Sequence, residues 1–189
     1  MNPSNLDEMR AELHALLADR SFRFGDFVLS SGRRSDVYFD GKQVTLDGRG
    51  LHLVARLVLD RCREMRVAAI GGMTIGADPI AAGVAALSGD GAPVRAFLVR
   101  KEAKGHGTGR RIEGPPLHSG ERVMVVDDVI TTGASLLAAV DALEGTGVEV
   151  VEALTIVDRE EGGRQAIEER GVPVRALFTR SEFAAPAVA

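Results

Sequence analysis

From residue 67 onward, short apolar stretches alternate with segments of helical periodicity, and this alternation constrains the fold more than any other feature of the chain. The apolar stretches are rich in valine, a strand-forming residue, and they occupy residues 67–70, 94–99, 122–126, 148–157 and 172–178. Strands that alternate with helices form a parallel sheet that is covered on both faces. The sequence therefore predicts an α/β fold with a doubly wound, mostly parallel sheet.

The first part of the chain has a different pattern. Apolar residues keep a helical spacing over residues 5–20 and again over residues 51–65. Short strand-like pieces, broken by glycine and serine, lie between these segments and predict a hairpin. We expect this region to form a hood of helix and hairpin that belongs to the same domain as the α/β core, and we expect a loose tail after the core. The hood, the core and the tail are predicted at residues 1–65, 66–180 and 181–189.

Composition and charge exclude several classes of protein. The formal net charge is −4, so the overall charge gives no reason to expect a nucleic-acid partner. No apolar run is long enough to span a bilayer, and the polar first ten residues lack the pattern of a signal peptide. The single cysteine, Cys62, excludes an internal disulfide framework; it is either a small buried residue on a helix or a catalytic thiol. We expect a cytoplasmic enzyme or binding protein without a membrane partner.

The stretch VMVVDDVITTGAS, at residues 123–135, joins a predicted strand to a predicted helix through polar residues. Asp127 and Asp128 follow the apolar run, and the backbone N–H groups of residues 131–135 belong to the first turn of the helix, where such donors lack helical partners. Gly133 allows close approach of backbone to a ligand, and the hydroxyls of this loop add donors. The loop suits a phosphate, whereas the carboxylates suit neutral hydroxyls or a divalent cation. The stretch predicts a sugar-phosphate site; simple capping of the turn and the helix is the alternative.

A second polar segment, VRKEAKGHGTGRRIEG, concentrates positive charge in an acidic chain. It carries six potential cations: Arg100, Lys101, Lys104, His106, Arg110 and Arg111. A dense anion such as pyrophosphate would attract this segment, and its three glycines would let it close over a site and exclude water. A solvated basic loop is the alternative. The chain contains neither a P-loop motif nor the dinucleotide-binding glycine fingerprint.

Ligands of open α/β sheets bind at the carboxyl ends of the strands. Polar, glycine-rich segments leave three of the predicted strands, at residues 71–78, 100–114 and 127–135. We therefore expect the functional site where these three segments converge.

The stretch VVDDVITTGAS resembles the signature with which type I phosphoribosyltransferases bind 5-phosphoribosyl 1-pyrophosphate (PRPP), and RKEAKGHG resembles the catalytic loop of the orotate phosphoribosyltransferases. The resemblance implies that the acidic pair binds the ribose hydroxyls and that the following loop binds the 5-phosphate. It implies catalytic roles for Lys104, His106 and Asp128. The PRPP-binding residues that it implies are Arg100, Lys101, Lys104, His106, Asp127, Asp128, Val129, Ile130, Thr131, Thr132, Gly133, Ala134 and Ser135.

Three further segments extend the resemblance over residues 22–163. FGDFVLSSGRRSDVYFD and IVDREEGG resemble orotate-binding segments, and GGMTIGADP lies where the family has its pyrophosphate loop. The implied orotate-binding residues are Tyr38, Phe39, Thr131 and Arg159, and the implied pyrophosphate loop contains Gly71, Gly72, Met73 and Thr74. The open alternatives are hairpin packing for the two aromatic residues, a surface salt bridge for the arginine and a plain strand-to-helix turn for the glycines.

The chain also departs from the family pattern. Ser30 stands where several members have a lysine, so that contact is either absent or made by Arg33, Arg34 or Lys42. The pyrophosphate segment also lacks the lysine that some members carry. Backbone N–H groups are the expected substitute there.

The resemblance implies transfer of the phosphoribosyl group of PRPP to orotate, which yields orotidine 5′-monophosphate and pyrophosphate in de novo pyrimidine biosynthesis. It implies Mg²⁺, held mainly by PRPP and not by direct protein ligands. It also implies a homodimer in which the loop at residues 100–111 reaches the site of the neighbouring subunit. The rival functions are a phosphoribosyltransferase for another base, a regulatory protein that senses PRPP without catalysis, and a general nucleotide-binding protein.

Overall fold

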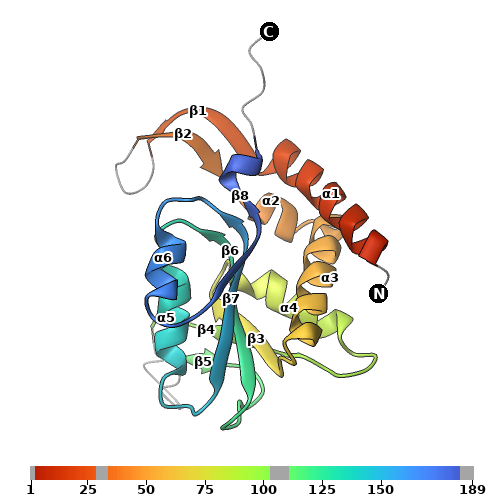
Figure 1. Cartoon of the computed structure of the whole chain (residues 1–189), viewed down its shortest axis with the longest axis vertical. Coiled ribbons are helices and arrows are strands. Elements are labelled where there is room, and N and C mark those ends of the chain that lie inside the picture. Colours follow the sequence, from red (N-terminus) through yellow and green to blue (C-terminus); the bar gives the residue numbers. More distant parts are fainter. Residues whose placement is uncertain (1–2, 29–33, 103–110, 184–189) are drawn as a thin grey trace.

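The centre of the molecule is a twisted sheet with the strand order β5-β4-β3-β6-β7-β8 (Figure 1). The computed structural model describes residues 3–28, 34–102 and 111–183. The parallel strands are β3 (Ala69–Met73), β4 (Arg95–Val99), β6 (Arg122–Ile130), β7 (Glu149–Asp158) and β8 (Val174–Thr179). The short β5 (Ile112–Glu113) pairs antiparallel with β4. The predicted α/β class with a mostly parallel sheet is confirmed.

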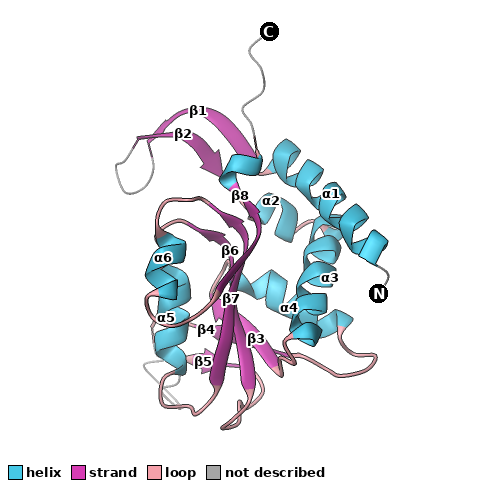
Figure 2. Ribbon diagram, viewed as in Figure 1, coloured by secondary structure: helices cyan, strands magenta, loops and turns pink. Residues whose placement is uncertain are grey.

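Helices cover both faces of this sheet, as Figure 2 shows. One face packs against α3 (Gly48–Glu64) and α4 (Ala77–Leu87), and the other packs against α5 (Ala134–Leu143) and α6 (Gly163–Glu168). Successive side chains of a strand point to opposite faces. Within β6, Met124 and Val126 therefore join the hydrophobic cluster on the first face, while Val123 and Val125 join the cluster on the second.

A hood of helix and hairpin lies over one end of the core, and it is smaller than the predicted hood of residues 1–65 because α3 packs on the sheet. It contains α1 (Pro3–Arg20), the antiparallel strands β1 (Phe22–Val28) and β2 (Arg34–Phe39), and the short α2 (Lys42–Thr45). The hairpin was predicted and is observed. The short α2 was not predicted, and α1 begins at Pro3, two residues before the predicted start. None of the helices within the described ranges is long and apolar enough to cross a bilayer.

The end of the described chain, residues 180–183, packs against the hood, whereas the sequence predicts a loose tail from residue 181; residues 184–189 of that tail lie outside the described residues. A 3₁₀ turn, η1 (Arg180–Glu182), follows β8, and the next residue, Phe183, is buried. Its ring centroid lies 4.2 Å from that of Phe22 and 4.3 Å from that of His14. The aromatic side chain explains the difference, because burial of its apolar surface between α1 and β1 holds the segment in place.

We expect Phe183→Ala to lower the free energy of unfolding by about 3–5 kcal/mol, because it leaves a cavity among aromatic rings. Urea denaturation followed by circular dichroism measures this loss. Phe183→Leu, which keeps most of the apolar volume, serves as the matched control and should lose less. Equal stability of the alanine variant and the wild-type protein would show that the segment does not anchor the hood.

The largest difference from the predicted strand boundaries lies in β6. The sequence predicted a strand that stops before the acidic pair, but β6 continues through both aspartates to Ile130. The partner strand β7 runs alongside, with Asp127 opposite Thr155 and Ile130 opposite Asp158. Backbone pairing with a neighbouring strand therefore overrides the preference of aspartate for turns.

Candidate active site

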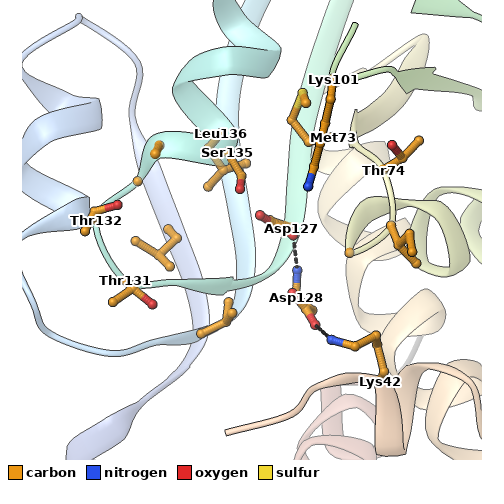
Figure 3. Close-up of a pocket in the computed structure, with 16 residues that line it drawn as sticks. Lys42, Met73, Thr74, Lys101, Asp127, Asp128, Thr131, Thr132, Ser135 and Leu136 are labelled. Atoms are coloured by element: carbon orange, nitrogen blue, oxygen red, sulfur yellow. Dashed lines mark hydrogen bonds and ion pairs between the residues drawn. The ribbon is translucent and has the colours of Figure 1, made fainter. Parts of the chain in front are cut away.

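A cavity of about 690 Å³ opens at the carboxyl ends of β3 and β6 (Figure 3). It is lined by Lys42, residues 73–76, Lys101 and residues 127–136. Each of the three polar segments that are expected to converge contributes to this lining, so the segments do meet at one cavity. Lys42 comes from the hood. From the sequence alone, this lysine is only one of three substitutes for the lysine that several family members have at the position of Ser30.

The acidic pair lies on the floor of the cavity. Asp127 and Asp128 are 7% and 6% exposed, and the backbone N–H of Asp128 donates to Oδ1 of Asp127 at 2.9 Å. Figure 3 shows Asp128 directed toward Lys42, whereas Asp127 lies on the side of Ser135. Burial, followed by the nearby charge of Asp128, raises the pKa of Asp127 to about 7. The cavity therefore contains a carboxyl group that takes up or loses a proton near neutral pH.

Two glycines allow backbone to pack directly against these carboxyl groups. A Cβ atom at Gly76 would collide with Oδ1 of Asp127 and lie 2.9 Å from Oδ1 of Asp128. A Cβ atom at Gly41 would lie 2.8 Å from Oδ2 of Asp128. Any larger residue at either position would displace the acidic pair, so both glycines shape the cavity. Neither was predicted as a site residue, because the segments that carry them are distant from the acidic pair in sequence.

The loop after β6 forms the second wall of the cavity. Gly133 has φ +80° and precedes the first turn of α5, and the N–H of Gly163 donates to the carbonyl of Thr131 at 3.0 Å. A Cβ atom at Gly133 would lie 2.8 Å from the carbonyl oxygen of Gly163, so only glycine fits both the backbone angle and the packing. Residues 131–136, which include the first residues of α5, line the cavity, and a helix start at a cavity is the arrangement that binds phosphate.

The other predicted PRPP contacts of this segment differ in what they can offer. Val129, Ile130, Thr131, Thr132, Ala134 and Ser135 all line the cavity. Ile130 is only 1% exposed and belongs to a hydrophobic cluster, so it can contribute backbone but not its side chain. The hydroxyls of Thr132 and Ser135 belong to exposed residues and are accessible to a ligand.

The predicted pyrophosphate loop begins later than expected. Gly71 and Gly72 are buried inside β3, where a Cβ atom would collide with the carbonyl oxygens of Phe97 and Val126. These glycines therefore permit close packing of strands and do not line the cavity. Met73 and Thr74 do line it, followed by residues 75 and 76.

Two aromatic residues, Tyr38 and Phe39, are predicted to contact orotate, and at most one of them is placed to do so. Phe39 is 9% exposed and packs on Phe22 with 4.9 Å between ring centroids, whereas Tyr38 is 45% exposed and lies 5.9 Å from Phe27. The pleat of β2 directs neighbouring side chains to opposite faces, so Phe39 enters the core and is not available to a ligand. Tyr38 stays available, but it does not line the cavity in this structure.

Arg159 is buried and also lies outside the cavity lining. Its guanidinium pairs with Glu161 at 3.0 Å and donates to the carbonyl of Val37 in the hairpin at 3.4 Å. The pair is not the surface salt bridge that was considered as an alternative, because the Arg159 side chain is only 7% exposed. The arginine connects the end of β7 to the hood.

Part of the predicted cationic segment can be placed. Lys101 lines the cavity, and Figure 3 shows its side chain on the opposite side of the acidic pair from Lys42. Arg100 is exposed and lies 3.6 Å from Glu113. Lys104 and His106, which carry the predicted catalytic roles, lie outside the described residues.

The residues of the cavity fit magnesium only with help from a ligand. Carboxylate oxygens such as those of Asp127 and Asp128 are the ligands that Mg²⁺ prefers. In the described part of the chain, however, no three metal-ligating side chains gather closely enough to hold a metal ion. A magnesium ion in this cavity would need further oxygens from water or from a bound diphosphate.

The class of protein follows from the whole domain. The family model described as phosphoribosyl transferase domain matches residues 67–172, which include strands β3 to β7 and every residue of the cavity lining except Lys42. The chain belongs to the phosphoribosyl transferase family. Comparisons over nearly the full length of the chain show where it belongs within this family.

An orotate phosphoribosyltransferase of Thermosynechococcus vestitus is 49% identical over 182 residues, which cover 96% of each chain. One of Aquifex aeolicus is 47% identical over 92% of this chain and 97% of its own. The crystal structure of Mycobacterium tuberculosis orotate phosphoribosyltransferase with Fe(III) dicitrate is similar, with a TM-score of 0.82 and 41% identity over 94% of this chain and 99% of that one. Within its family, the chain belongs to the orotate phosphoribosyltransferases.

Proposed function

We propose that the protein uses this cavity to transfer the phosphoribosyl group of PRPP to orotate. The observation that carries the proposal is the position of a buried acidic pair beside a glycine-containing helix start in one cavity of about 690 Å³. The carboxyl groups suit ribose hydroxyls, and the helix start suits the 5-phosphate. A solved Mycobacterium tuberculosis orotate phosphoribosyltransferase in complex with PRPP matches this chain with a TM-score of 0.75 at 34% identity, over 94% of this chain and 92% of that one. That likeness supports PRPP as the ligand.

In the proposed reaction, the bond between C1 of ribose and the diphosphate oxygen breaks, and the diphosphate keeps the electron pair. A ring nitrogen of orotate attacks C1 from the opposite face, forms the new C–N bond and loses its proton. The ribose ring gains positive charge between these events. Asp127 and Asp128 hold the ribose, and the negative charge of the pair favours the cationic ring. The protein mainly positions the two substrates and excludes water.

The negative charge of the leaving diphosphate needs to be neutralised from the side of the acidic pair that lies away from Lys42. Lys101 lines the cavity there, and the sequence places Lys104 and His106 in the same segment. Magnesium bound to the diphosphate would supply further neutralisation, and Asp127 or Asp128 could contribute an oxygen ligand. The implied cytoplasmic location stays a prediction from the sequence.

Turnover with different bases tests the proposed substrate. Purified protein with Mg²⁺ and PRPP should form a nucleotide and pyrophosphate with orotate but not with adenine, guanine or hypoxanthine. Turnover of a purine alone would assign the site to another base. PRPP binding without turnover of any base would favour a regulatory protein.

We also propose that the site is shared between two subunits of a homodimer. Lys104→Ala should lower turnover far more than it weakens PRPP binding, because its charge would act on the leaving group. When that chain is mixed and reassociated with an Asp128→Asn chain, heterodimers should restore roughly a quarter of the sites. Activity that stays at the level of the separate variants would indicate sites built within single subunits.

A further inference from the structure

Lys42 connects the hood to the acidic pair. Its Nζ lies 2.9 Å from Oδ1 of Asp40 and 3.7 Å from Oδ2 of Asp128, and its side chain lines the cavity (Figure 3). The preceding residue, Gly41, packs its backbone against the same carboxyl group of Asp128. Two independent contacts from adjacent residues therefore fix the position of the Asp128 side chain.

The position of Lys42 is itself well determined. Oδ1 of Asp40 accepts from the backbone N–H of Lys42 at 3.2 Å, and Oδ2 of Asp40 accepts from Gln43 at 3.0 Å. Burial acts to lower the pKa of Lys42, but the carboxyl groups of Asp40 and then Asp128 outweigh it and hold the pKa above its usual value. The lysine is therefore charged at neutral pH. Asp40 anchors the ammonium group, and the same group reaches Asp128.

The charge of this lysine bears on how a polyanion can enter the cavity. An acidic pair on the floor would repel PRPP, which carries a phosphate and a diphosphate. The ammonium group of Lys42 offsets the charge of Asp128 from the hood side, and its side chain is 46% exposed, so it can also face an incoming ligand. Lys101 lies across the cavity and could attract the diphosphate, but no ion pair joins it to Asp128 among the described contacts.

We infer that Lys42 is a positioning residue for PRPP: it orients the Asp128 carboxylate toward the ribose and offsets its charge, so that the polyanionic substrate can bind. This inference rests on the proposed function. It assigns to the hood a part in binding the sugar phosphate, beyond covering the base. The residue acts through Asp128, and it is not required for the bond-breaking step.

Lys42→Met removes the charge and keeps the length of the side chain. We expect the KM for PRPP and its Kd, measured by calorimetry without orotate, to rise about tenfold, with kcat and the KM for orotate unchanged. The defect should shrink at higher ionic strength, because salt screens the repulsion from Asp128. Lys42→Arg should recover most of the affinity. Gln43→Met, which also removes a partner of Asp40 but does not contact Asp128, is the matched control and should bind PRPP normally.

A double-mutant cycle tests the route through Asp128. If Lys42 acts through that carboxylate, Lys42→Met should add little to the PRPP-binding defect of Asp128→Asn. Additive effects, a rise in the KM for orotate instead of PRPP, or normal PRPP binding by Lys42→Met would each overturn the inference. Failure of the wild-type protein to bind PRPP or to turn over orotate would instead overturn the proposed function, so the two failures are distinguishable.

Discussion

Replacing Gly76 by alanine is expected to weaken PRPP binding and to lower turnover by about 100-fold or more, because misplacement of site groups by about 1 Å has effects of that size. The new Cβ atom would collide with Oδ1 of Asp127 and crowd Oδ1 of Asp128. The backbone at Gly76 is right-handed helical, with φ −60° and ψ −40°, so alanine adopts it without strain. The expected loss therefore comes from displacement of the carboxyl groups and not from the backbone.

Gly48→Ala is the matched control for this substitution. Gly48 begins α3, and a Cβ atom there would meet no atom within 4 Å. We expect this variant to keep full activity and to gain up to about 1 kcal/mol of stability, because alanine restricts the unfolded chain. Calorimetric titration with Mg²⁺ and PRPP, together with circular dichroism, separates a binding defect from misfolding. A folded Gly76→Ala protein with wild-type affinity would show that the acidic pair need not stay where the structure places it.

The glycines of the cavity show which features of the structure could be predicted from the sequence and which could not. The alternation of apolar runs and helical patterns predicted the sheet, its helices and the edge where the cavity opens, since these depend on local periodicity. The roles of Gly41 and Gly76 depend on how closely distant segments approach the acidic pair, and no periodicity encodes that distance. Lys42 escaped a firm assignment for the same reason, because its contact with Asp128 joins the hood to β6.

For other differences between the prediction and the structure, the sequence did contain a signal of the observed arrangement. Tyr38 and Phe39 are neighbours in a predicted strand, and alternation means that only one of them can face a ligand. Gly71 and Gly72 follow an apolar run without an intervening polar residue, so their continuation of the strand was a possible interpretation. The extension of β6 through Asp127 and Asp128 had no such signal, because it depends on pairing with β7.

The second large effect is expected at Asp127, where Asn should strongly impair function and increase stability. Turnover and PRPP affinity should fall by about 100-fold or more, because the amide cannot supply the negative charge that favours the cationic ribose. At the same time, the wild-type carboxyl group is buried beside Asp128, and its pKa is raised to about 7. Ionisation of this group is therefore unfavourable in the folded protein.

The pH dependence of stability follows from the two states of this carboxyl group. In the unfolded chain it ionises near its ordinary pKa of 3.8, whereas in the folded protein it keeps its proton until about pH 7. Between these values the folded state binds more protons at this group, so the contribution of Asp127 to stability falls as the pH rises and levels off above pH 7. The advantage of Asp127→Asn should be absent near pH 4 and approach about 4 kcal/mol at pH 8, because each unit of the pKa rise corresponds to about 1.4 kcal/mol.

Urea denaturation at pH 5, 6, 7 and 8 measures this advantage directly. Asp90→Asn is the matched control, because Asp90 is exposed and the same chemical change there should leave stability within about 0.5 kcal/mol at every pH. The amide Oδ1 of Asn at position 127 can still accept from the backbone N–H of residue 128, so the local hydrogen bond is retained. An Asp127→Asn protein that is less stable than the wild type at pH 8 would contradict the conclusion that the buried carboxylate of Asp127 destabilises the folded protein. A more stable but inactive protein would show that the site keeps this charge at a cost to the fold.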